Sequence, residues 1–164
     1  MEIILKHLWV GFIVGAIMNA VRMKRRTKQY RLDDPSLARG YDLFFIAMII
    51  YGCLPWSIAG FGILTGLAEG TFDFFNPATM NPIVLLFYFA VIAIGMVITI
   101  WIYLLNGAEF IESHPEIVQV NLFGNRTHFT ARQVKLFYPV MAALSIAVIV
   151  LLWKLDIPSP AFSK

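Results

Sequence analysis

Residues 83–105 have the sequence IVLLFYFAVIAIGMVITIWIYLL, which contains no charged side chain. A helix needs about 20 consecutive apolar residues to cross the hydrocarbon core of a bilayer. Within lipid the backbone must satisfy its own hydrogen bonds, so a spanning segment of this kind is expected to be α-helical. Asn81 and Pro82 precede the run as N-cap and first helical residue, and Asn106-Gly107 follows it as a stop signal. The segment therefore predicts one membrane-spanning helix.

The composition of the whole chain agrees with this prediction. Of the 164 residues, 59% are hydrophobic and 14% are charged, and the mean hydropathy is +0.74. A soluble domain carries about 45–50% apolar and about 25% charged residues. These values exclude a soluble domain, a disordered tail and a nucleic-acid-binding module. The single cysteine, Cys53, excludes an internal disulfide and matches no metal motif, so we expect no cofactor and no metal.

Three further apolar runs are long enough to span a bilayer: residues 3–21, 41–67 and 131–153. We therefore predict an all-α integral membrane protein, a four-transmembrane-helix bundle that forms a single membrane domain over residues 1–164. The expected connecting segments are a basic cytoplasmic loop 22–40, an outer loop 68–82, a cytoplasmic loop 106–130 and an outer tail 154–164.

Local signals mark where two of these helices begin. Asp34 and Pro35 form an N-cap and first-residue pair, which indicates that the second helix starts before the bilayer. Thr130 and Gln133 have the spacing of a capping box, so the fourth helix is expected to start at Ala131.

The loop between the third and fourth helices has a different pattern. Over residues 118–122, valine and leucine alternate with Gln119 and Asn121, which is the period of a half-buried strand. Gly124-Asn125 follows as a two-residue turn. We predict a small β-hairpin here. Because a lone hairpin is only marginally stable, it would have to pack on the helix ends, the membrane or a partner.

Lysine and arginine are unevenly distributed over the predicted topology. Seven lie in residues 22–40 and three in or just after residues 106–130, whereas the opposite side carries only Lys6, Lys154 and Lys164. Positive charge accumulates on the cytoplasmic side of membrane proteins. We therefore expect a multi-pass protein of a bacterial inner membrane, with both termini on the non-cytoplasmic side.

Small residues recur at a spacing of four, which places them on one face of a helix and lets another backbone approach. Two interpretations remain open: packing within the bundle, or docking onto another membrane subunit or a second copy. The positions are Gly11 and Gly15 in the first run, whose face Asn19 continues, and Gly62 and Gly66 in the second run, where Trp56 and Gly60 show the same spacing.

The basic loop predicts contact with anionic lipid headgroups, with an acidic partner protein as the alternative. We do not expect nucleic acid, because no fold presents the patch. The residues are Arg22, Lys24, Arg25, Arg26, Lys28 and Arg31.

Three phenylalanines, Phe72, Phe74 and Phe75, cluster in the outer loop. They predict a lid that lies in the outer interface. The alternative is that they mark a contact with a partner, since clustered exposed aromatic side chains are typical of interaction surfaces.

Glu109, Glu112, His114 and His128 are the only residues that resemble the components of a reactive site. Their spacing matches no metal motif, and no nucleophile or oxyanion donor accompanies them. We interpret them as a solvated acidic connector.

The absence of charge within the predicted spans argues against ion-coupled transport, which needs ionisable groups inside the membrane. We expect a non-catalytic accessory or scaffold subunit of a larger membrane complex. One alternative is a homo-oligomeric channel or carrier for a neutral or lipid-like solute. A second is a membrane enzyme that uses the Glu/His residues.

Overall fold

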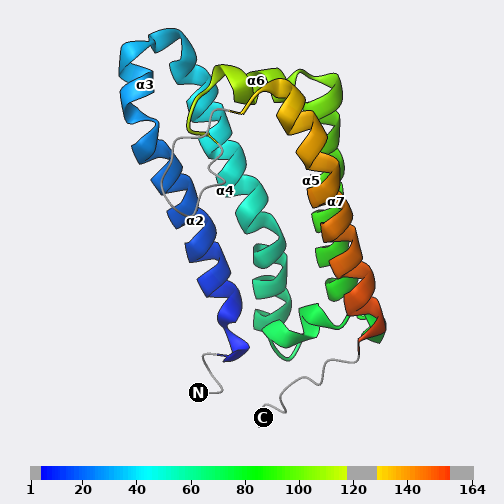
Figure 1. The fold of residues 1–164 in the computed structure, drawn as a ribbon. Helices are drawn as coiled ribbons and strands as arrows, with labels where there is room; N and C mark the ends of the chain where they lie inside the picture. The colour runs from blue at the N-terminus through cyan, green and yellow to red at the C-terminus, as the bar shows by residue number, and fades with distance from the viewer. Residues whose placement is uncertain (1–4, 118–128, 156–164) are drawn as a thin grey trace.

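The computed structural model describes residues 5–117 and 129–155, and these residues are almost entirely helical (Figure 1). In chain order the helices are α2 (Leu8–Arg26), α3 (Lys28–Asp33), α4 (Pro35–Leu64), the 3₁₀ helices η1 (Thr71–Phe75) and η2 (Pro77–Thr79), α5 (Pro82–Leu104), α6 (Gly107–Ser113) and α7 (Ala131–Lys154).

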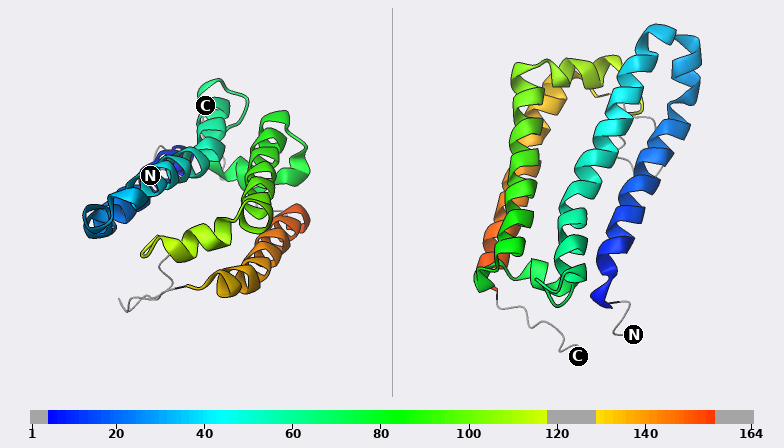
Figure 2. Two further views of the ribbon diagram at one scale, coloured as in Figure 1. Left: turned by 90° about the horizontal axis from the view of Figure 1, so that it is seen from above. Right: turned by 180° about the vertical axis from the view of Figure 1, so that it is seen from behind.

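The four long helices α2, α4, α5 and α7 run alternately up and down the molecule (Figure 1). Helix α3 extends α2 at one end, and α6 crosses from α5 towards α4 at the same end. We call this the basic end, because it carries the residues between Arg22 and Arg39. Seen from above, α2 and α4 form one pair and α5 and α7 another (Figure 2). The two 3₁₀ helices connect the pairs at the opposite end.

Three of the four long helices, α4, α5 and α7, start where the sequence predicts. Asp34 and Asn81 are N-caps whose side-chain oxygens each accept the backbone N–H two residues later, at 3.0 Å. The capping box is present: the Thr130 hydroxyl accepts from the Gln133 N–H at 3.3 Å, and the Gln133 side chain accepts from the Thr130 N–H at 3.0 Å. These bonds satisfy backbone donors that a helix start otherwise leaves unpaired.

Helix α2 packs along α4 in the antiparallel direction. The Phe12 and Trp56 rings stack with centroids 3.9 Å apart. One turn further along α2, Ala16 faces Gly52, where the missing side chain lets the two backbones approach closely. Nearer the basic end, the Lys24 ammonium lies 4.6 Å from the centroid of the Phe45 ring. The α2–α4 pair therefore forms a continuous helical hairpin.

The hydrophobic core lies at the end opposite to the basic end. There the last turns of α4, the 3₁₀ helix η1 and the first turns of α5 come together. Its buried members are Ala59, Ile63, Ala68, Phe74, Ile83, Val84, Phe87 and Tyr88. The core thus joins α4 to α5 at one end only.

The prediction of a four-transmembrane-helix bundle with a β-hairpin is corrected by the structure. In the part of the chain that the structure describes, three helices are long and apolar enough to cross a membrane: α4, α5 and α7. Helix α2 is not among them, because its apolar part, residues 8–21, is shorter than about 20 residues and its last turn is basic. The described residues contain no strand, and the predicted hairpin at 118–128 lies outside them.

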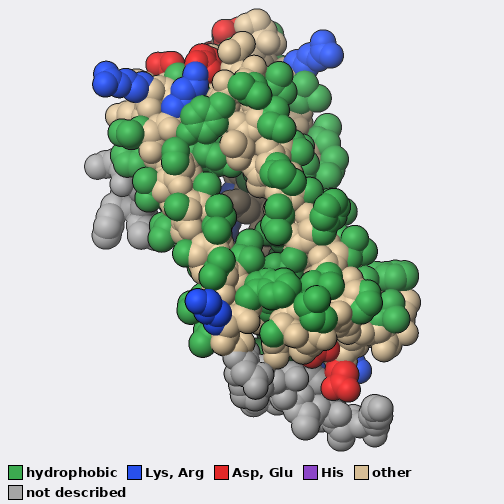
Figure 3. Space-filling view, turned by 90° about the vertical axis from the view of Figure 1, so that its right-hand side faces the viewer, with side chains coloured by type: hydrophobic (Ala, Val, Ile, Leu, Met, Phe, Trp, Pro, Cys, Tyr) green, Lys and Arg blue, Asp and Glu red, His purple; other side chains and the backbone are tan. Residues whose placement is uncertain are grey.

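The three candidate spans identify a membrane protein, and the surface agrees with this. Helix α7 has no buried residue, although it is strongly apolar. Figure 3 views the molecule from the side of α5 and α7: apolar side chains cover the middle of this face, and charged side chains gather towards its two ends. Such a distribution suits a surface whose middle contacts lipid.

Candidate functional site

The small residues of the two helical runs have different surroundings. A Cβ atom at Gly60 would lie 2.7 Å from the Trp9 ring, and one at Gly62 would lie 2.7 Å from Ile83. By contrast, a Cβ atom at Gly11 or Gly15 would have no heavy atom within 4 Å. The glycines of α4 are therefore occupied by contacts within the molecule, whereas those of α2 face outwards.

The other residues predicted to form helix-packing faces also lie in different surroundings. Trp56 is partly buried against Phe12, while Asn19 is exposed on α2. Gly66 follows the end of α4 with φ of +75°, a backbone conformation that side chains rarely adopt. It therefore serves the turn after the helix and is not part of a packing face. Gly52 is not among the predicted positions, because it has no small partner four residues away, but an added Cβ atom there would lie 2.9 Å from the Ala16 Cβ atom on α2.

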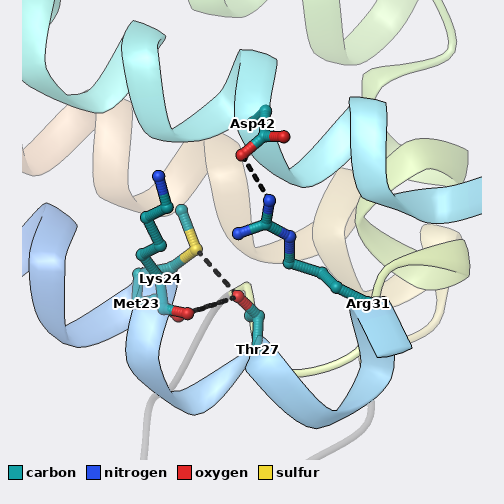
Figure 4. A network of polar contacts seen from close by, with 5 residues as sticks. All are labelled: Met23, Lys24, Thr27, Arg31 and Asp42. Carbon is teal, nitrogen blue, oxygen red and sulfur yellow. Dashed lines mark hydrogen bonds and ion pairs between the residues drawn. The ribbon is translucent and has the colours of Figure 1, made fainter. Parts of the chain in front are cut away.

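Five of the six basic residues of the loop fall into two groups. Arg22, Arg25 and Lys28 are exposed and form no side-chain hydrogen bond or ion pair with any residue that the structure describes. Arg31 donates to Asp42 on α4 at 2.7 Å, and Lys24 lies over Phe45. Figure 4 shows the Arg31–Asp42 pair and, at the junction of α2 and α3, the buried Thr27 hydroxyl, which donates to the Met23 carbonyl at 2.9 Å. The exposed group is the one available to lipid headgroups or a partner.

Arg26 is the exception, because it is half-buried. Its guanidinium donates to the backbone carbonyls of Glu116 at 2.6 Å and Ile117 at 2.5 Å, beyond the end of α6. Burial lowers the pKa of Arg26, and the nearby Glu116 acts in the opposite direction. The side chain therefore ties the α2–α4 hairpin to the segment that follows α6, and we assign it to the fold.

The three phenylalanines of the outer loop do not lie together at the surface. Phe74 is buried in the core, and its backbone carbonyl accepts from the Tyr88 hydroxyl at 3.0 Å. Phe72 and Phe75 are partly buried and contact each other edge to face, with ring centroids 6.2 Å apart. The segment is thus part of the packed end of the bundle.

Thr71, at the start of η1, is a structural residue that the sequence analysis missed. It is fully buried, accepts from the Trp9 N–H at 3.2 Å and donates to the Lys6 carbonyl at 2.9 Å. It therefore anchors the start of α2 to the connection between α4 and α5. A single threonine in a loop carries no signal from which this role could be predicted.

The Glu/His residues are not brought together into one site. Glu109 pairs with Lys135 at 2.6 Å, and Glu112 accepts from the first N–H of α7 at 3.2 Å. His114 is buried, and its ring stacks on Phe110 with centroids 3.9 Å apart. Each residue is engaged separately, and no group of three or more potential metal ligands occurs among the described residues. His128 lies outside them.

Helix α6 closes one end of an apolar groove. The sequence predicts only a solvated acidic connector in this segment. The groove lies between α4 and α5 on the side of the basic end, and its volume is about 700 Å³. Its lining consists of Leu43, Phe44, Ala47, Met48 and Tyr51 from α4, Val97, Ile98, Ile100, Trp101, Ile102 and Leu105 from α5, and Phe110 and Ile111 from α6. Small-molecule sites commonly have volumes of about 300–1,000 Å³.

The position of the groove follows from the position of the core. Because α4 and α5 pack tightly only at the opposite end, they are held apart at the basic end by the aromatic side chains of α6 and its neighbours. Phe110 lies between Phe44, at 6.2 Å, and Trp101, at 5.6 Å, measured between ring centroids. The rim is open to the side, since Leu43 is 58% and Leu105 is 64% exposed.

Comparison of the chain with protein-family models, with curated proteins and with solved structures found no match.

Proposed function

We propose that this chain is a non-catalytic accessory or scaffold subunit of a larger membrane protein complex. The observation that carries the proposal is the outward face of α2, where Gly11 and Gly15 meet none of the residues that the structure describes. Glycines lose side-chain packing and weaken a helix unless another surface approaches them. In membranes, faces of this kind are enriched where a second helix packs closely.

Asn19 also supports the proposal that a partner helix packs on this face of α2. It lies four residues beyond Gly15 on the same face, it is exposed, and its side chain forms no hydrogen bond with any described residue. An amide in or near the bilayer gains from a hydrogen bond to a neighbouring helix. The helix that covers the two glycines would therefore also bring a hydrogen-bonding group to Asn19.

The test is purification of the tagged chain from its native membranes in mild detergent. We expect a second membrane protein to copurify with the unaltered chain and to be lost from the Gly11→Ile/Gly15→Ile variant. The matched control is Ala143→Ile/Ala147→Ile, which enlarges two exposed positions with the same spacing on α7. Recovery of the unaltered chain as a lone monomer would overturn the proposal.

We further infer that the basic end lies in the cytoplasm of a bacterial cell. The described residues at this end include Arg22, Arg25, Lys28 and Arg39, all exposed, and the opposite end has far fewer basic side chains. A membrane-impermeant maleimide tests the orientation in a Cys53→Ser background. We expect intact cells to label Ala78→Cys, in η2, and to leave Lys28→Cys unlabelled; the reverse pattern would refute the orientation.

A carrier for a lipid-like solute is the second candidate, because the apolar groove is large enough for part of such a molecule. Reconstituted liposomes distinguish the two functions. Transfer of a fluorescent lipid between leaflets at a rate well above that of empty vesicles would favour the carrier function. A transfer rate equal to that of empty vesicles would exclude it.

A further inference from the structure

The groove between α4, α5 and α6 has a distinct polar end. Arg39 lies one helical turn before Leu43, so the two side chains are neighbours on the surface of α4. Arg39 is exposed and forms no hydrogen bond or ion pair with any residue that the structure describes. Two other cations at this end of the molecule, Arg31 and Lys135, are paired with Asp42 and Glu109. An uncompensated positive charge therefore stands at the mouth of an apolar groove.

The dimensions of the groove suit a lipid tail. Along α4 the lining extends from Leu43 to Tyr51, which corresponds to about 12 Å at a rise of 1.5 Å per residue. Half of a hydrocarbon core of about 30 Å has nearly the same thickness. The groove thus reaches from the polar end to about the middle of the bilayer, as one acyl chain of a single leaflet does.

The shape of the groove argues against a helix as its occupant. Phe110 and Ile111 of α6 close its upper end, so a partner helix could not continue past it. A helix with its side chains also needs a width of about 10–12 Å. A flexible acyl chain can enter through the open side, between Leu43 and Leu105, without displacing α6.

We propose that this groove binds an anionic glycerophospholipid. One acyl chain lies between α4 and α5, and the phosphate contacts Arg39. A guanidinium forms paired hydrogen bonds with phosphate oxygens. In an anionic lipid, no positive group within the headgroup neutralises the phosphate charge. A zwitterionic headgroup carries such a cation, so the groove prefers the anionic lipid. The assignment does not depend on the scaffold function.

Native mass spectrometry of the detergent-purified protein measures this preference. The probes are phosphatidylglycerol and phosphatidylcholine with identical acyl chains. We expect the unaltered protein to retain phosphatidylglycerol about fivefold more strongly, the ratio expected for one arginine near an anionic headgroup. Arg39→Gln should bring the ratio close to one, whereas the control Arg132→Gln, at an exposed arginine on α7, should leave it unchanged. Equal retention of both lipids by the unaltered protein would overturn the proposal.

The position of the acyl chain in the groove is tested separately. Ala47→Phe places a ring inside the groove and should remove retention of both lipids, whereas the control Ala143→Phe, on the exposed face of α7, should not. An Ala47→Phe protein that melts like the unaltered protein and still retains lipid contradicts the assignment.

Cross-linking of the unaltered protein avoids any effect of substitution on folding. A phosphatidylglycerol with a diazirine in its acyl chain should label peptides that contain residues 43–51 and 97–105 above all others. Labelling spread evenly over the exposed residues of α7 would refute the groove as a specific site.

Discussion

The close contact between Gly52 and Ala16 allows a quantitative test of how α2 is held against α4. An added Cβ atom at Gly52 would lie 2.9 Å from the Ala16 Cβ atom, closer than an ordinary van der Waals contact. Neither atom can rotate away, because both are fixed to the helix backbones. Gly52→Ala must therefore move the two helices apart or strain them.

The expected magnitude follows from a matched substitution. In both Gly52→Ala and Gly11→Ala, the helix gains about 1 kcal/mol of intrinsic propensity. At Gly11 the new methyl group meets nothing within 4 Å, so this gain is retained. At Gly52 it is offset by overpacking, which costs about 1–3 kcal/mol. The free energy of unfolding should therefore be about 1–3 kcal/mol lower in Gly52→Ala than in Gly11→Ala.

The assay is reversible unfolding in mixed micelles of dodecyl sulfate and a mild detergent, followed by far-ultraviolet circular dichroism. A double-mutant cycle with Ala16→Gly isolates the contact, because this change removes the atom that the new methyl group would strike. We expect Ala16→Gly to cost about 1 kcal/mol in the unaltered protein and clearly less in the Gly52→Ala background, where it also relieves the overpacking. If Gly52→Ala is as stable as Gly11→Ala, or if the cycle shows no coupling, the proposed close approach of the two helices is refuted.

Three further substitutions test other contacts in the same assay. Arg26→Ala leaves two backbone carbonyls beyond α6 without their donor and should cost about 1–3 kcal/mol, whereas the exposed control Arg22→Ala should change the stability by less than about 0.5 kcal/mol. Thr71→Val removes both hydrogen bonds to the start of α2 and should cost about 1–3 kcal/mol, while Thr71→Ser, which keeps the hydroxyl, should cost clearly less; equal losses would contradict the role of the hydroxyl. The hydrogen bond from Lys135 lowers the pKa of Glu109, so the stabilisation by this pair is present above the ordinary carboxyl pKa of about 4.3 and is lost as the pH falls through the lower folded value. The unaltered protein should accordingly be slightly more stable than Glu109→Gln at about pH 7 and equally stable at about pH 2. If the difference in stability is the same at both pH values, the Glu109–Lys135 pair is not its cause.

The acidic residues and the histidine around α6 show that residues close in sequence need not form one site. Glu109, Glu112 and His114 are close in sequence, yet they point to Lys135, to the start of α7 and to Phe110. Glu109 and Glu112, three residues apart, share the face of α6 that meets the first turns of α7, whereas His114 follows the helix and packs back on Phe110. Proximity along the chain therefore did not assemble a reactive site.

The sequence by itself determined the class of protein and the starts of three of its long helices. Hydropathy is a property of composition, and the N-caps at Asp34, Asn81 and Thr130 depend on bonds to residues only two or three positions away. Such local interactions are the same whatever lies around the helix. They required no knowledge of the tertiary structure.

The tertiary structure alone decided which faces of the helices meet. A spacing of four places Gly11 and Gly15 on one face, but it does not state whether that face turns towards α4 or away from it. The contact between α2 and α4 instead uses Gly52, opposite Ala16, and Gly60, opposite Trp9. The groove below α6 depends in the same way on where distant segments come together, because packing is decided by the shapes of both partners and a sequence pattern describes only one.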